Sequence, residues 1–178
     1  MKTRFDSYCG IYCGACPILV ANVKGVVEKK AKAWELDAKD IVCQGCKAKT
    51  VAGICKDCVM RLCAQDRGLD SCAECDDYPC GTIQAFQRDR FPHHTLIAAN
   101  LEAIADRGVD AWLEEQKKRW SCPSCGEPFT WYEEECAKCG AELYDACAEE
   151  NDWANDETRE DEGEAAYWKL RKKLRRFR

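Results

Sequence analysis

The sequence lacks a long hydrophobic run. No apolar stretch among its 178 residues approaches the roughly 18 residues of a membrane-spanning helix, so a membrane span is excluded. The first ten residues include Asp6 and Cys9 and lack the apolar core of a signal peptide, and we therefore expect a cytoplasmic protein. The chain also has no Ser/His/Asp group, phosphate-binding glycine loop or nucleotide fingerprint, so no catalytic motif argues for an enzyme.

Ordinary apolar residues are also scarce. The hydrophobic fraction is 46%, but it includes 16 Cys, which leaves about 37% of other apolar residues. That is little for a core of this length, so another interaction must stabilise the fold. In a reducing compartment, closely spaced cysteines bind metal more often than they form disulfides. The composition therefore predicts a metal-stapled protein in which folding is coupled to metal binding.

The C-terminal cysteines form two matching knuckles, CPSCG at 122–126 and CAKCG at 136–140. A C-x2-C pair lets two thiolates reach one ion, and the following Gly permits a tight turn. The arrangement resembles a short zinc ribbon and predicts a closed site for structural zinc, with iron in a rubredoxin-like site as the alternative. Trp131 and Tyr132 are interpreted as strand residues that pack on the ribbon, with a contact surface as the alternative. The expected ligands are Cys122, Cys125, Cys136 and Cys139.

Eleven more cysteines lie between residues 9 and 80, and we expect all of them to bind metal: Cys9, Cys13, Cys16, Cys43, Cys46, Cys55, Cys58, Cys63, Cys72, Cys75 and Cys80. Two closed sites would leave three of them spare, whereas three sites need one more ligand, from His93, His94, Cys147, water or substrate. We assign the pairs 13/16 and 43/46 to one site. The triads 55–63 and 72–80 repeat the spacing C-x2-C-x4-C and are expected to supply the others.

Three redox interpretations apply to these N-terminal cysteines. The spacing of Cys9, Cys13 and Cys16 is that of the radical-SAM cluster motif, but the chain lacks the strand–helix series of a partial barrel. The pair Cys13/Cys16 resembles a dithiol redox motif, which requires a preceding βαβ unit that twelve residues cannot form. Iron–sulfur clusters for electron transfer stay open as an interpretation, because several cysteine spacings serve clusters.

The cysteine-free stretch between the two groups is predicted to be helical. A helix over 83–90 stops before Pro92. Apolar residues then recur at helical spacing up to Gly108, and a further helix begins at Asp110, which together indicate a helical hairpin. Near the N-terminus, one helix is expected over 17–34.

Two oppositely charged segments follow the second cysteine group. Residues 148–166 have a net charge of −8, and the last twelve residues carry seven Lys and Arg around apolar positions at helical spacing. This basic amphipathic tail can bind nucleic acid or fold back on the acidic segment. The net charge of −5 disfavours nucleic-acid binding by the whole surface.

We therefore predict a small, mostly α, metal-stapled fold of five segments. These are an irregular Cys-rich module at 1–80, a helical hairpin at 81–120, a C-terminal β zinc ribbon at 121–145, an acidic linker at 146–166 and the basic tail at 167–178. The functional hypothesis is a non-catalytic zinc-binding protein, an interaction or adaptor module with an unidentified protein partner. The alternatives are an iron–sulfur electron carrier or accessory subunit of a redox enzyme, and a nucleic-acid-associated zinc-ribbon protein.

Three motifs of the N-terminal half also stand in a characteristic order: YCGIYCGACP at 8–17, CQGC at 43–46 and CAECDDYPC at 72–80. Over roughly residues 5–85 they resemble the signature of an uncharacterised prokaryotic Cys-rich family, domain of unknown function thirty-seven ninety-five. The resemblance implies no known reaction or substrate. It implies a metal-binding role for Cys9, Cys13, Cys16, Cys43, Cys46, Cys72, Cys75 and Cys80.

Overall fold

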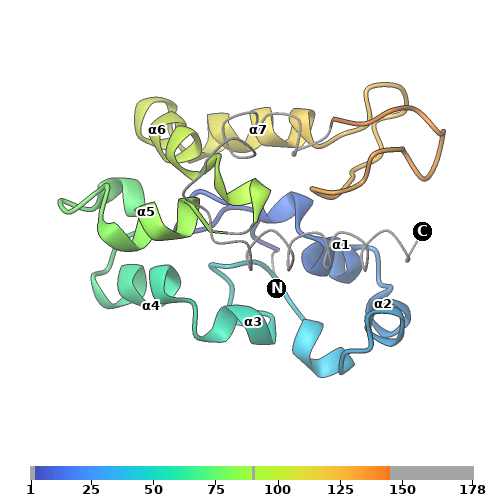
Figure 1. Ribbon diagram of the computed structural model, residues 1–178, viewed down its shortest axis with the longest axis horizontal. Helices are drawn as coiled ribbons and strands as arrows, with labels where there is room; N and C mark the ends of the chain where they lie inside the picture. The colour runs from blue at the N-terminus through green and yellow to red at the C-terminus, as the bar shows by residue number, and fades with distance from the viewer. Residues whose placement is uncertain (1–2, 90, 145–178) are drawn as a thin grey trace.

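The computed structural model of the protein describes residues 3–89 and 91–144, and these residues are mostly helical (Figure 1). The α-helices are α1 (Pro17–Val23), α2 (Val27–Trp34), α3 (Gly53–Lys56), α4 (Val59–Asp66), α5 (Gly81–Gln87), α6 (Ile97–Arg107) and α7 (Val109–Arg119). Short 3-10 turns are η1 (Cys13–Ala15), η2 (Ala38–Ile41), η3 (Cys72–Glu74) and η4 (Pro92–His94). The expectation of a small, mostly α fold is confirmed. Within these ranges no helix has the length and apolar character needed to cross a membrane.

The helix expected over 17–34 is wrong as a single element, because the chain breaks it into α1 and α2. Gly25 lies at the break with a φ of 65°, a left-handed conformation that other residues adopt only at a cost. The turn lets the two helices fold against each other, and Ala21, Ala31 and Trp34 are buried between them and η2. The apolar pattern predicted helix correctly on both sides of the glycine and missed the reversal.

The hairpin of α6 and α7 turns at Gly108, which has a φ of 83° and follows the last residue of α6. The two helices lie along one edge of the molecule in Figure 1, opposite α3 and α4. Ile97 and Leu101 of α6 and Trp112 of α7 are fully buried. These side chains pack against residues of the N-terminal half, so the hairpin supplies much of the hydrophobic core.

The β strands expected for a C-terminal zinc ribbon are not formed in the described residues. Two isolated antiparallel bridges stand in their place, between Ser121 and Pro128 and between Glu135 and Glu142. Backbone hydrogen bonds close each knuckle, from the Cys122 N–H to the Glu127 carbonyl oxygen at 2.9 Å and from the Cys136 N–H to the Ala141 carbonyl oxygen at 2.8 Å. The knuckles therefore form without a sheet.

The main hydrophobic cluster joins segments that are far apart in the sequence. Tyr12 and Ala15 of the N-terminal half pack with Trp112 of α7 and with Phe129 and Trp131 between the C-terminal knuckles. Trp131 also donates its backbone N–H to the Ala15 carbonyl oxygen at 3.3 Å. The C-terminal cysteine segment is consequently held against both the hairpin and the N-terminal half.

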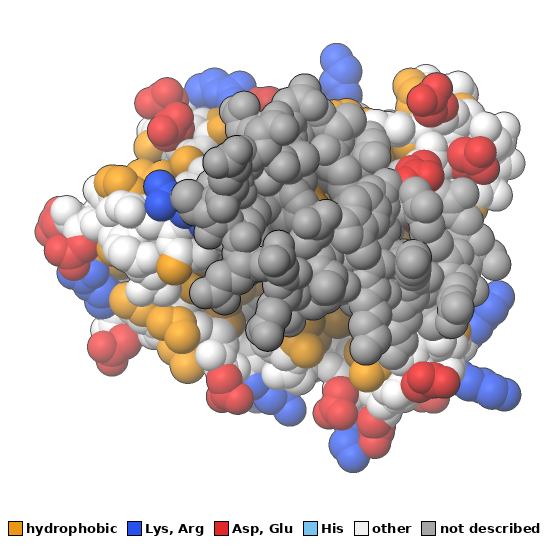
Figure 2. Space-filling model, in the orientation of Figure 1, with side chains coloured by type: hydrophobic (Ala, Val, Ile, Leu, Met, Phe, Trp, Pro, Cys, Tyr) orange, Lys and Arg blue, Asp and Glu red, His pale blue; other side chains and the backbone are white. Residues whose placement is uncertain are grey.

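Acidic and basic side chains are interspersed around the rim of the face seen in Figure 2, and apolar side chains gather near α3 and α4. Ile54, Val59 and Leu62 are the exposed large apolar residues of that region. The segments expected to form the acidic linker (146–166) and the basic tail (167–178), together with Cys147, lie outside the described residues.

Candidate metal centres

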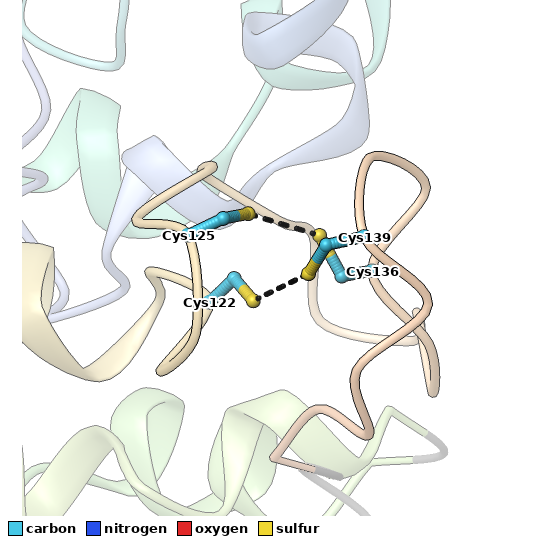
Figure 3. Close-up of side chains that lie close together, drawn as sticks. All are labelled: Cys122, Cys125, Cys136 and Cys139. Atoms are coloured by element: carbon cyan, nitrogen blue, oxygen red, sulfur yellow. Dashed lines mark hydrogen bonds between the residues drawn. The ribbon is translucent and has the colours of Figure 1, made fainter.

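The four C-terminal cysteines converge on one point. Their sulfur atoms all lie within 4.8 Å of one another, with 3.6 Å between Cys122 and Cys139 and 3.6 Å between Cys125 and Cys136. Figure 3 shows the two knuckles facing each other, with each sulfur directed toward the opposite pair. A tetrahedral ion with bonds of about 2.3 Å to sulfur holds its thiolates about 3.8 Å apart. The four cysteines can therefore hold a metal ion.

The two knuckles share one backbone geometry. Gly126 and Gly140 have φ values of 72° and 71°, and their N–H groups donate to the carbonyl oxygens of Cys122 and Cys136 at 2.9 and 2.8 Å. A glycine is required after each C-x2-C pair because the chain enters the left-handed region there. This repetition of one turn places two sulfurs from each side around the same point.

Backbone donors favour the thiolate of Cys122, whereas Cys139 remains protonated. Burial raises the pKa of Cys122, but N–H groups of Cys125 and Ser124, with hydrogen bonds from Cys139 and Cys136, outweigh it and lower the pKa to about 7. The N–H of Ala141 lowers the pKa of Cys139, yet hydrogen bonding to Cys125 and burial raise it to about 12. Four thiols that share protons in this way ionise together only when a cation is present.

Aromatic residues fix the centre in place. Trp131 and Tyr132 are buried, as their interpretation as packing residues predicted, but they lie in a turn and not in a strand. The His93 ring stacks on Trp131 with 3.7 Å between ring centroids and hydrogen-bonds the Tyr132 hydroxyl. Burial, with a contribution from His94, holds the pKa of His93 well below its usual range, so His93 is neutral.

Neither His93 nor His94 lies in the described four-cysteine centre. The Nδ1–H of His94 donates a hydrogen bond to the Asp89 carboxylate at 2.7 Å, and the ring centroids of His94 and Phe86 lie 3.9 Å apart. The two histidines thus connect α5 and η4 with the C-terminal segment. Sequence reasoning did not identify this aromatic contact, because its partners are 38 or more residues apart and form no local pattern.

The N-terminal cysteines lie around two apolar clusters. Leu19, Ala52 and the buried Cys43 form one cluster, against which Cys13, Cys16 and Cys55 pack. The other consists of Cys9 with side chains of α4, α5 and α6, and it packs against Cys58, Cys72 and Cys80. Cys55 therefore packs against the same cluster as Cys13, Cys16 and Cys43.

The two C-x2-C-x4-C triads have different local structures. Cys58 precedes α4 and Cys63 lies within it, whereas Cys72 begins η3 and a cis peptide bond at Tyr78–Pro79 precedes Cys80. The equal spacing therefore occurs in two different local backbone structures. Cys63, Cys75 and Cys80 all contribute charge near Cys72, and burial followed by these charges raises the pKa of Cys72 to about 12.

Comparison with known families confirms the resemblance found in the motifs. Residues 5–85 match the family described as "Protein of unknown function (DUF3795)". No curated protein and no solved structure matches the chain. The matched segment ends before α6, so it covers the N-terminal cysteines and leaves the four-cysteine centre outside.

Proposed function

We propose that this chain, which carries a domain of the DUF3795 family at residues 5–85, is a non-catalytic zinc-binding protein that serves as an interaction module. The observation that supports this function is the convergence of four sulfurs within 4.8 Å in the C-terminal segment. Zinc fits a site of four thiolates and needs no further ligand there. Because four thiolates complete the coordination shell, no position is left for water or substrate. The role of the ion is therefore to stabilise the structure of the surrounding surface.

The position of the centre supports a structural role. Cys122 and Cys136 are buried in the same cluster as Trp112, Trp131 and Tyr12. Loss of the ion would leave four adjacent thiols whose ionisation is no longer compensated, and would loosen the aromatic packing around them. The ion thus links the stability of the C-terminal segment to that of the hairpin and the N-terminal half.

Zinc content of the full chain tests the proposal. Protein purified without oxygen is analysed for zinc and iron, beside the double variant Cys125→Ser/Cys139→Ser and the control Cys147→Ser. We expect the double variant to lose one zinc per chain and the control to lose none. Equal zinc content in all three proteins, or iron lost in place of zinc, would overturn the assignment.

A further inference from the structure

A cavity lies between the end of α7 and the C-terminal cysteine segment. Its volume is about 510 Å³, which falls within the range of ligand-binding pockets. Helix α7 contributes Lys118 and Arg119 to the lining, and the C-terminal segment contributes Pro123, Phe129 and Tyr144. The cavity therefore combines two cations with apolar and aromatic side chains.

Contacts among the lining residues hold the cavity in shape. Trp120 packs against both Phe129 and Tyr144, with ring centroids 5.5 Å apart in each pair. The central carbon of the Arg119 guanidinium lies 4.7 Å from the centroid of the Tyr144 ring, and the guanidinium donates a hydrogen bond to the Tyr144 hydroxyl. Because these side chains are already ordered against one another, binding in the cavity costs the protein little conformational entropy.

The basic end of α7 gives the cavity its charge. Lys117, Lys118 and Arg119 occupy the last turn of the helix, where cations also complement the helix dipole. Among the residues that the structure describes, no carboxylate forms an ion pair with Lys118, which is exposed and lines the cavity. An occupant that carries carboxylates beside an aromatic ring would match both the cations and the aromatic lining.

We propose that the acidic segment of this same chain binds in the cavity, with Trp153 against the aromatic lining and the neighbouring carboxylates near Lys118 and Arg119. The segment lies outside the described residues, and its sequence carries the required chemistry. Residues 149–157 read EENDWANDE, in which one tryptophan stands among five acidic residues. This binding goes beyond the proposed metal-binding function and does not depend on which ion the four-cysteine centre holds.

The acidic segment begins close to the cavity along the chain. Tyr144 is the last described residue and itself lines the cavity, so the chain leaves the described structure at the edge of the site. Trp153 follows nine residues later, and nine residues span at most about 30 Å when fully extended. A connection of this length allows a return into the cavity. It also gives a local concentration in the millimolar range, at which weak contacts suffice for binding.

Charge favours this occupant over the basic tail at 167–178. The tail also contains a tryptophan, Trp168, among apolar positions at helical spacing. Its seven Lys and Arg, however, would meet Lys118 and Arg119 with charge of the same sign. The acidic segment at 148–166 has a net charge of −8 and is attracted to the same cations.

The experiment follows Trp153 in the full chain. Indole N–H signals of the isotope-labelled protein are recorded by NMR, and Trp153→Phe and Trp168→Phe identify the two signals of interest. The exchange rate of each indole hydrogen with water is then measured, beside that of a synthetic peptide of residues 148–160. We expect exchange at Trp153 to be several-fold slower in the full chain than in the peptide.

Two charge reversals at neighbouring positions locate the contact. We expect Lys118→Glu to return the exchange at Trp153 to the rate in the peptide. Lys117→Glu is the matched control, because it makes the same change one residue away, at an exposed side chain that does not line the cavity. We expect slow exchange at Trp153 to persist in this control.

Three outcomes would overturn the inference. Exchange at Trp153 as fast in the full chain as in the peptide would show that the segment is not bound. Equal effects of Lys118→Glu and Lys117→Glu would show general attraction to the end of α7 without use of the cavity. Loss of slow exchange on deletion of residues 167–178, but not in Lys118→Glu, would show that the acidic segment pairs with the basic tail. Zinc content is measured in the same samples, so failure of the metal assignment is distinguishable from failure of this binding.

Discussion

Asp6 is a buried carboxylate that joins the N-terminal segment to the cysteine motif at 43–46. It accepts hydrogen bonds from Arg4 at 2.9 and 2.8 Å and pairs with the buried ammonium of Lys47 at 2.8 Å. Burial raises the pKa of Asp6, but the two cations outweigh it and lower the pKa to about 2. The ionised form is therefore favoured in the folded state.

Replacement of Asp6 tests this ion pair. We expect Asp6→Asn to lower the free energy of unfolding at pH 7 by about 1 kcal/mol after allowance for solvent screening. Because the folded-state pKa is depressed, the stabilisation is complete above pH 4 and disappears as the pH falls toward 2. Denaturant unfolding of both proteins at several pH values measures it. Asp37→Asn, which breaks an exposed pair with Lys39, serves as the control; an equal effect of the two substitutions would contradict the argument.

Gly45, within the motif CQGC, has little room for a side chain. Its φ is 109°, and an added Cβ would lie 1.9 Å from the Arg4 carbonyl oxygen. We expect Gly45→Ala to lower the denaturant midpoint and the free energy of unfolding by more than about 2 kcal/mol. Gly25→Ala is the control, because Gly25 has a left-handed φ but open space around it, so only backbone strain of about 1 kcal/mol applies. Similar losses in both variants would show that the close approach to Arg4 is unimportant.

At the scale of elements, Asn100 of α6 organises a buried chain of hydrogen bonds. Its amide donates to the Gly10 carbonyl oxygen at 2.8 Å, and its own oxygen accepts from Trp112 at 3.1 Å and from Gln116 at 3.4 Å. Gln116 in turn accepts from Trp120 at 3.2 Å. The chain fixes α6 against α7 and ties both helices to the first cysteine motif.

Substitution of Asn100 tests this chain. Asn100→Leu keeps the size of the side chain but leaves a buried carbonyl and a buried indole N–H without partners, so we expect a loss of about 2 to 3 kcal/mol in thermal or denaturant unfolding. Gln84→Leu is the matched control, since Gln84 also donates to a backbone carbonyl but is exposed. A loss at Asn100 no larger than that at Gln84 would show that water replaces the missing partners.

The sequence predicted those elements whose signals are local. Gly108 ended α6 as expected, and the spacing of the C-terminal knuckles identified four residues whose sulfurs converge. Spacing did not identify how the N-terminal cysteines group, because Cys16, Cys43 and Cys55 come from three segments that pack around Leu19 and Ala52. The bend at Gly25 was missed for a related reason. A glycine within an apolar pattern is tolerated inside a helix. The reversal is favoured by the burial of Trp34 against η2, a contact with residues outside the expected helix.

At the scale of the whole molecule, apolar side chains of the N-terminal half, of the α6–α7 hairpin and of the C-terminal segment meet around the C-terminal centre. Trp120 and Phe129 pack with ring centroids 5.5 Å apart, and Trp131 extends the contact to His93. Cys122 and Cys136 are buried among these rings. The proposed ion therefore contributes to packing well beyond its ligands.

Removal of the metal should be visible in this packing. With a strong chelator and a reductant at pH 7, we expect the tryptophan emission of the wild type to shift to longer wavelength and the melting temperature to fall by more than about 10 °C. Cys125→Ser/Cys139→Ser is the comparison, because it lacks two of the four proposed ligands before chelation. A wild type that keeps both its emission and its melting temperature after complete metal removal would contradict the structural role.

Residues 5–85 depend on later residues for part of their apolar cover, which limits how this segment could be transferred to another protein. Tyr12 and Ala15 belong to the segment that matches the family, yet their cover comes from residues after position 85. Ile97 and Leu101 cover Cys9 in the same way. A gene fusion that transferred only the matched segment would leave two apolar faces open to water, and the new neighbour would have to shield them. In this chain, residues 5–85 therefore depend on later residues for the cover of Tyr12, Ala15 and Cys9.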